Sequence, residues 1–115
     1  VYAPAETARR MIAGVAQAHQ RIAGETPTGA AYRASDEALL NWVHATASYG
    51  FFEAYSRFVH PLSRVELDQL FAEGAAGAAL YGAHGAPRSA DQLEALFAAM
   101  APQLECSAVI FAFLE

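Results

Sequence analysis

The sequence contains few of the residues on which several protein classes depend. Among its 115 residues there is one cysteine and no lysine, and all 7 basic residues are arginine. The single cysteine, Cys106, excludes an internal disulfide and a cysteine-rich zinc site, and we expect it to be a small buried side chain. The net charge of −5 and the lack of a basic stripe argue against binding to nucleic acid or to an anionic membrane surface.

Long hydrophobic runs are also missing. None reaches the ~18 residues of a membrane-spanning helix, and the longest, residues 108–114, lies at the very end. Residues 1–5 have neither the basic region nor the apolar segment of a signal peptide, so we expect a cytoplasmic protein. Because the sequence begins without Met and stops just after an apolar run, we also expect a fragment of a larger domain.

What the sequence has is apolar residues in a helical pattern. Hydrophobic residues make up 55% of the chain and charged residues 17%, against a typical charged fraction of about 25%. We predict one all-α domain over residues 1–115, a compact bundle of four to five helices that forms part of a larger helical domain. The predicted helices are residues 5–23, residues 35–59, one after the capping box Ser63–Glu66, one after the similar pattern Ser89–Gln92, and one in the closing apolar run.

The segments between these helices carry little strand signal. We predict a loop over residues 25–34, where Pro27 and Gly29 act as breakers. Only residues 109–111 have a strand-like composition, and they are too isolated to pair. Ser35 is the expected N-cap of the second helix, which is apolar on most sides and is therefore the expected central helix.

Two of the four histidines stand on helix faces that are otherwise apolar. His19 shares its face with Val15 and Ile22, and His44 lies between Leu40 and Ala47, one turn away on either side. A lone histidine in such a place is more often a hydrogen-bonded core residue than a ligand. Two of them on helices that pack together favour a site, since imidazole is the commonest metal-ligating side chain.

Small residues surround His44 on its own helix, from Ala45 to Gly50. A planar cofactor lying against a helix needs such clearance, with an axial histidine projecting from it. The same strip would equally admit a neighbouring helix, as residues 74–78 do on the third helix. Thr46 has two possible roles as well, because its hydroxyl can bond back to its own helix or face a pocket.

Five segments together resemble a known family. They are His19-Gln20-Arg21-Ile22-Ala23-Gly24, Gly29-Ala30-Ala31-Tyr32-Arg33-Ala34-Ser35-Asp36, Leu39-Leu40-Asn41-Trp42-Val43-His44-Ala45-Thr46, Ala54-Tyr55-Ser56-Arg57-Phe58 and Pro61-Leu62-Ser63-Arg64-Val65-Glu66-Leu67. They are similar to the large bacterial family of helical proteins related to rubber oxygenase (latex clearing protein) and to the fungal ER-bound oxygenase MpaB. The run from Trp42 to Thr46 is the most specific element.

The resemblance implies an all-helical fold that holds a b-type haem. By this analogy His44 is the axial iron ligand, Ala47 and Phe51 lie beside the cofactor, and His19 and Thr46 are the catalytic polar groups, with His19 near the opposite haem face. The chain departs from the family at Ala16, where the usual pattern has an arginine.

Two functions follow as hypotheses. The first is a haem-dependent oxidoreductase that uses dioxygen to oxidise an apolar small molecule, for example by cleaving an alkene. The second is a non-catalytic helical module, a dimerisation or regulatory scaffold whose histidines are structural and which forms a homo-oligomer through its apolar faces. The paired histidines and the strip of small residues favour the first.

Overall fold

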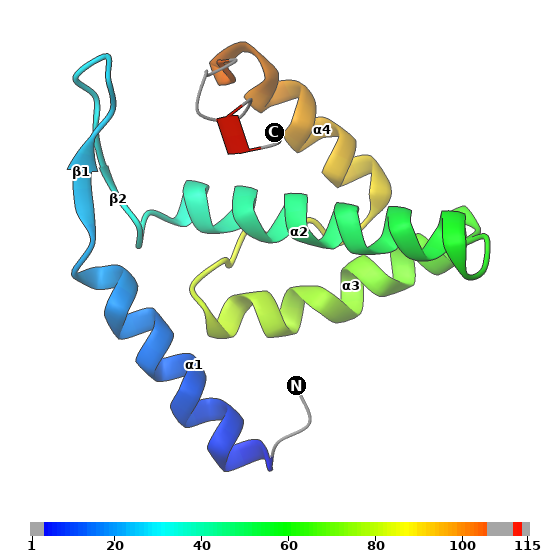
Figure 1. Ribbon diagram of the computed structural model, residues 1–115. Helices are drawn as coiled ribbons and strands as arrows, with labels where there is room; N and C mark the ends of the chain where they lie inside the picture. Colours follow the sequence, from blue (N-terminus) through cyan, green and yellow to red (C-terminus); the bar gives the residue numbers. More distant parts are fainter. Residues whose placement is uncertain (1–3, 106–111, 114–115) are drawn as a thin grey trace.

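The computed structural model describes residues 4–105, 112 and 113, and helices dominate them (Figure 1). The helices of this part are α1 (Ala5–Gln20), α2 (Glu37–Phe58), α3 (Arg64–Leu80) and α4 (Ala90–Met100), followed by the short 3-10 helix η1 (Ala101–Gln103). Two short strands, β1 (Ala23–Glu25) and β2 (Ala31–Arg33), separate α1 from α2. The predicted closing helix lies outside the described residues except for residues 112 and 113, and so do Cys106 and residues 109–111.

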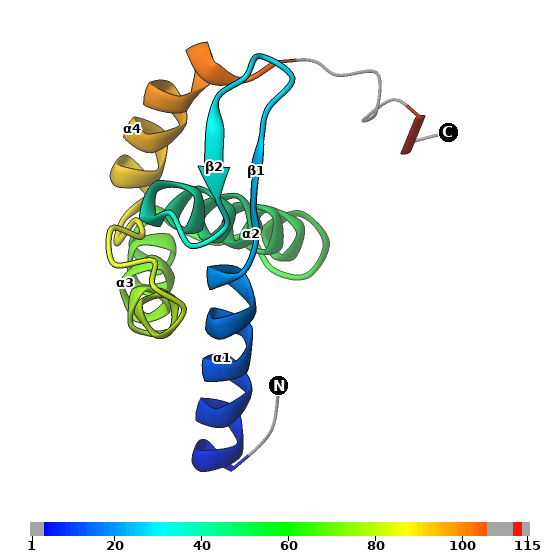
Figure 2. The ribbon, with the colours of Figure 1, turned by 90° about the vertical axis from the view of Figure 1, so that its left-hand side faces the viewer.

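The central helix is α2, as the sequence predicts. It runs across the middle of Figure 1 with α4 above it and α3 below it. Viewed from the side in Figure 2, α1 extends away from these three helices. The radius of gyration is 15.8 Å, larger than the value of about 13 Å for a compact domain of this length. The described part is therefore more open than the compact bundle that the sequence predicts.

The strands correct the prediction of a strictly all-α fold. They form an antiparallel hairpin in which Gly24 pairs with Tyr32, and α1 ends at Gln20 instead of continuing to residue 23. The Tyr32 ring lies across Gly24, since a Cβ placed there would come within 2.9 Å of the Tyr32 hydroxyl. An aromatic side chain that covers a cross-strand glycine is a known stabilising device of sheets.

A turn at residues 26–30 closes this hairpin. Gly29 N–H donates to the carbonyl of Thr26, and the Thr26 hydroxyl accepts from Ala30 N–H at 3.1 Å. Pro27 has the φ that the second position of such a turn requires, and Gly29 takes a φ of +83°, which costs glycine little. The two breakers that indicated a loop are thus the turn residues of a hairpin with very short strands.

The N-termini of α3 and α4 begin at serine N-caps that the sequence predicts. Ser63 and Glu66 form the predicted capping box at α3. At α4 the Ser89 hydroxyl accepts from Gln92 N–H, whereas the Gln92 side chain accepts from Arg88 N–H.

The start of α2 differs from the prediction. Its N-cap is Asp36, not Ser35. The Asp36 carboxylate does not cap the helix, because it accepts a hydrogen bond from Arg33 N–H at 2.9 Å at the end of β2.

The core lies where α2, α3 and α4 meet. Four residues are buried there, Ala45, Phe71, Ala90 and Leu93, and partly buried Phe52, Leu67, Leu96 and Phe97 pack against them. By contrast, α1 has no buried residue. No helix in the described part of the chain combines the length and the apolar character that crossing a membrane requires.

Candidate functional site

His19 and His44 line the same cavity. It has a volume of about 180 Å³ and lies where the end of α1 approaches α2 and α3. The other lining residues are apolar or aromatic: Leu40, Val43, Ala47, Ala78, Tyr81 and Ala83. The sequence places each histidine on an apolar helix face, and the fold brings the two faces together around one space.

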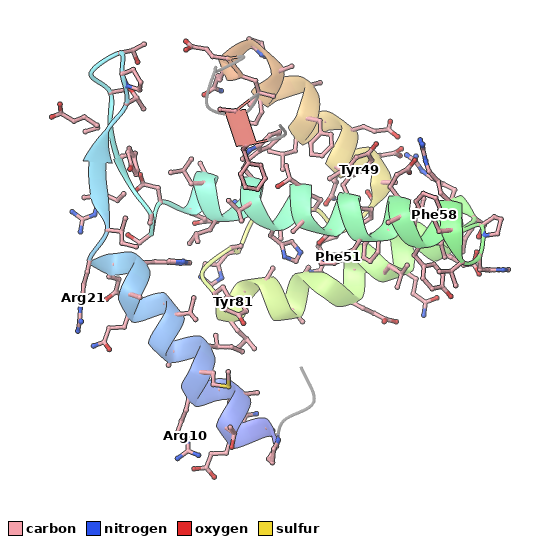
Figure 3. The ribbon with its side chains drawn as sticks, viewed as in Figure 1. Arg10, Arg21, Tyr49, Phe51, Phe58 and Tyr81 are labelled. Carbon is pink, nitrogen blue, oxygen red and sulfur yellow. The ribbon has the colours of Figure 1, made fainter. Side chains whose placement is uncertain are left out.

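The end of α3 forms one wall of this cavity. Gly82 N–H donates to the carbonyl of Ala79, and Ala83 N–H donates to the carbonyl of Ala78, both at 3.1 Å. This pair of bonds is the Schellman motif, with Gly82 at a φ of +93° and an apolar contact between Ala83 and Ala78. The motif turns the chain back on itself, so that Tyr81 and Ala83 both line the cavity. Figure 3 labels Tyr81 at this end of α3.

A polar contact anchors the loop that follows. The Asn41 side-chain carbonyl accepts a hydrogen bond from Gly85 N–H at 3.1 Å. A Cβ at Gly85 would approach the Asn41 amide nitrogen to 2.6 Å, so a larger residue here would require the Asn41 side chain to move. Asn41 therefore fixes the wall of the cavity against the helix that carries His44. Sequence reasoning did not assign roles to Asn41 and Tyr81, although Asn41 stands within the segment that carries the family resemblance.

His44 points from α2 toward α3. Its Nε2 lies 3.3 Å from the Ser48 hydroxyl, one turn further along α2. A Cβ on Gly74 of α3 would be 3.9 Å from the same nitrogen, so the small residue leaves the imidazole its space. Burial lowers the pKa of His44 below its ordinary value of 6.5, because a desolvated imidazolium is unfavourable. The ring is therefore neutral at neutral pH, which is the form that binds metals.

His19 occupies the last turn of α1. Its Nδ1 is buried and has no hydrogen-bond partner among the described residues. A buried polar atom without a partner costs about 1–3 kcal/mol, and native structures contain few of them. The Nδ1 of His19 is thus a polar atom whose hydrogen-bonding capacity the described chain leaves unused.

A second, more polar cavity adjoins the first. It has a volume of about 470 Å³ and shares His19, Leu40 and Tyr81 with the histidine cavity. Glu37 and His84 are among its remaining lining residues. The histidine cavity therefore has an apolar end against α2 and a polar side beyond His19.

The other sequence-predicted site residues lie in different places. Ala47 lines the histidine cavity. The Thr46 hydroxyl donates to the carbonyls of Trp42 and Val43, at 3.1 Å each, so it takes the helix-bonding role of its two alternatives. Phe51 is 75% exposed and lines a separate apolar cavity with Tyr55. The structure thus brings His19, His44 and Ala47 together and leaves Thr46 and Phe51 apart from them.

The donor set around the cavity suits some metal groups better than others. Within residues 4–105, 112 and 113, no three His, Cys, Asp or Glu side chains are grouped to hold a metal ion. A haem iron needs only one or two side chains, since the porphyrin supplies its other ligands. Two histidines beside one cavity are compatible with such an axial role.

Comparison with known proteins identifies the family. Residues 1–115 match the family described as ER-bound oxygenase mpaB/B'/Rubber oxygenase, catalytic domain. No curated protein and no solved structure matches the chain. The match confirms the resemblance carried by the segments between His19 and Leu67.

Proposed function

The chain belongs to the family of mpaB and rubber oxygenase catalytic domains, and from this premise we propose that it provides the haem-binding core of an oxygenase that acts on an apolar substrate. His44 is the proposed iron ligand. His19 is the proposed polar group at the opposite side of the cofactor, and Ala47 belongs to the surface against which the cofactor lies. Thr46 and Phe51, which we also predicted at this site, do not contact the cofactor in this proposal. They contribute only as parts of α2, the helix that carries His44.

One observation carries the proposal, namely the cavity that His19 and His44 share. Buried histidines scattered through a helical scaffold would each be hydrogen-bonded to a neighbour. Here the Nδ1 of His19 has no partner in the described chain. The remaining walls are apolar or aromatic, as expected for a pocket that takes an apolar molecule and a flat cofactor.

The chemistry of the donors fits a haem. A neutral imidazole is required for iron ligation, and burial favours the neutral form of His44. Ser48 lies within hydrogen-bond distance of the same ring and is suited to orient it. The cavity of about 180 Å³ and its neighbour of about 470 Å³ together offer space in the range of ligand sites, about 300–1,000 Å³.

Each part of the site has a distinct role in this proposal. A bound haem would supply the dioxygen-binding iron and the redox chemistry of the oxygenase. His44 would hold the iron, with Ser48 setting the ring orientation. His19 would offer a hydrogen bond on the other side, and Leu40 and Val43 would bind the substrate by excluding water.

An ultraviolet-visible spectrum of the full-length protein tests the proposal. We expect a Soret band after reconstitution with haem b, and we expect its loss or a large shift in His44→Ala. His60→Ala is the matched control, because His60 is exposed and follows the end of α2, so its spectrum should stay that of the unchanged protein.

A full-length protein that folds and remains colourless after reconstitution would contradict the haem role. The alternative, a non-catalytic module with structural histidines, would then stand. The exposed aromatic residues of α2, Phe51 at 75% and Phe58 at 84%, are what that alternative would use for association.

A further inference from the structure

A second cavity with a different character lies among α2, α3 and α4. Its volume is about 320 Å³. Tyr49 of α2 lines it and lies on the side of α2 that faces α4 (Figure 3). Tyr49 comes two residues after Ala47, which is about 200° around the helix, so this groove and the histidine cavity use different sides of α2. We call it the aromatic groove.

The apolar part of the groove consists of four aromatic rings together with Leu67, Ala90 and Leu93. Phe71 is 3% exposed and makes the floor, with the Phe52 ring edge-on to it at a centroid distance of 5.1 Å. Phe97 and Tyr49 form the second pair, with centroids 5.4 Å apart and an interplanar angle of 76°. Phe97 is also edge-on to Trp42, with a centroid distance of 5.3 Å, so the aromatic rings of the groove belong to a connected set.

Charged side chains from all three helices form the rim. Glu53 and Glu94 line the groove together with Arg64. All three are in ion pairs, Arg64 with both Glu94 and Asp91. Glu53 is bonded to Arg57 at 2.5 Å.

The charges of this rim do not cancel. Two carboxylates, Glu53 and Glu94, line the groove against one guanidinium, Arg64. Their ion-pair partners outside the lining, Arg57 and Asp91, cancel each other. The opening thus has an excess of one negative charge above a floor of aromatic rings.

From this combination we propose that the aromatic groove binds a small molecule with an organic ammonium head, such as a quaternary or alkylated amine. Aromatic faces attract such cations within about 6 Å of the ring centroid, and the carboxylate excess complements the same charge. A fatty or aromatic carboxylate fits less well, because it would add a negative charge to an opening that already has an excess of one. This site does not depend on the haem proposal, since it uses neither histidine.

Three isosteric probes test the proposal on the full-length protein without added haem. Choline carries the cation, and neohexanol replaces its nitrogen with carbon. The carboxylate tert-butylacetate (3,3-dimethylbutanoate) carries a negative charge on a similar carbon skeleton. Ligand-observed saturation-transfer NMR would measure their affinities. We expect choline to bind at least about threefold more tightly than neohexanol, and tert-butylacetate to bind most weakly.

Two substitutions locate the binding. Glu94→Gln removes one carboxylate and releases part of the Arg64 charge, so the preference for choline over neohexanol should disappear. Phe97→Leu keeps an apolar side chain but removes a ring, and should weaken choline by about threefold while leaving neohexanol little changed. Glu73→Gln is the matched control, since Glu73 is an exposed residue of α3 bonded to Gln69 and does not line the groove.

Several results would overturn the proposal. They are equal binding of choline and neohexanol, tighter binding of tert-butylacetate, the absence of saturable choline binding, and a choline preference that survives Glu94→Gln. Because Glu94 is on the surface and its replacement leaves the core intact, the test remains decisive even if Phe97→Leu does not fold.

Discussion

The two sides of α2 differ in how they are packed. Toward α4 and the start of α3, α2 contributes Ala45, which is fully buried, to a core with Phe71 and Leu93. Toward α1 it contributes His44 and Ala47 to an open cavity, and no residue of α1 is buried. The first side has large apolar side chains in mutual contact, whereas on the second side two histidines border a cavity with both small and large apolar walls.

This difference indicates that one side of α2 stabilises the fold and the other side forms the candidate binding site. Burial of large apolar side chains supplies most of the favourable free energy of folding, about 1.5–3 kcal/mol for each. The residues of α2 that line the histidine cavity are only partly buried or exposed, so the cavity side adds less to stability and retains space for a ligand. If this interpretation is correct, equivalent changes on the two sides will have different effects on stability and on haem binding.

The largest effect is expected in the core. Phe71→Ala removes a ring that is 3% exposed and packs edge-on against Phe52. We expect the free energy of unfolding to fall by about 3–5 kcal/mol, measured by urea denaturation of the full-length protein. Phe58→Ala is the control on the same type of residue at 84% exposure, and its effect should stay within about 0.5 kcal/mol. Similar losses for both variants would show that Phe58 is covered in the full-length protein.

A pair of alanines two positions apart on α2 sharpens the comparison. Ala45 is fully buried, so Ala45→Leu should overpack the core and cost about 1–3 kcal/mol. Ala47→Leu projects into the histidine cavity instead. It should change stability by less than about 0.5 kcal/mol while abolishing the Soret band on reconstitution.

Thermal unfolding and haem titration of these two variants would separate the sides. Normal haem binding by a stable Ala47→Leu variant would contradict the assignment of the cavity. An Ala45→Leu variant of unchanged stability would contradict the tight packing of the core around Ala45.

The smallest effect is a pH dependence on the open side. Burial lowers the pKa of His44 in the folded chain below its ordinary value of 6.5. The unfolded state therefore binds more protons than the folded state between these two pKa values, and stability falls as the pH drops below about 6.5 toward the lowered pKa. Above about pH 6.5 the group makes no difference, because the ring is neutral in both states.

Urea midpoints of haem-free protein on either side of about pH 6.5 would measure this effect. His44→Gln should reduce the loss of stability at the lower pH, since glutamine does not titrate. An identical pH profile in the variant would place the titrating group elsewhere.

Local signals in the sequence determined the helices. The Ser63 and Glu66 capping box begins α3 where it is predicted, because a cap satisfies N–H groups only three residues away. Glu53 and Arg57 form an ion pair at 2.5 Å, since residues four apart are neighbours on any helix. Apolar periodicity likewise placed His19 and His44 on their faces.

The hairpin was not predicted, because it has no such local signal in the sequence. Its strands have three residues each, too few to show an alternating pattern. Their stability comes from the turn at residues 26–30 and from Tyr32 lying across Gly24. The predicted N-cap of α2 was also wrong. Asp36 occupies this position instead of Ser35, because its carboxylate is bonded to the end of β2.

Only the tertiary structure decided how the two histidines are related. The sequence by itself determined the family and the helix faces, since residue identity and a 3.6-residue period are local properties. It could not determine that these faces would meet, because that depends on the hairpin that directs α1 and on the Schellman turn that brings Tyr81 and Ala83 to the cavity. The sequence also could not show that Phe51 and Ala47, which are neighbours on one helix, line different cavities. That separation arises because α3 and the segment before it pack near Phe51 and form a second cavity there.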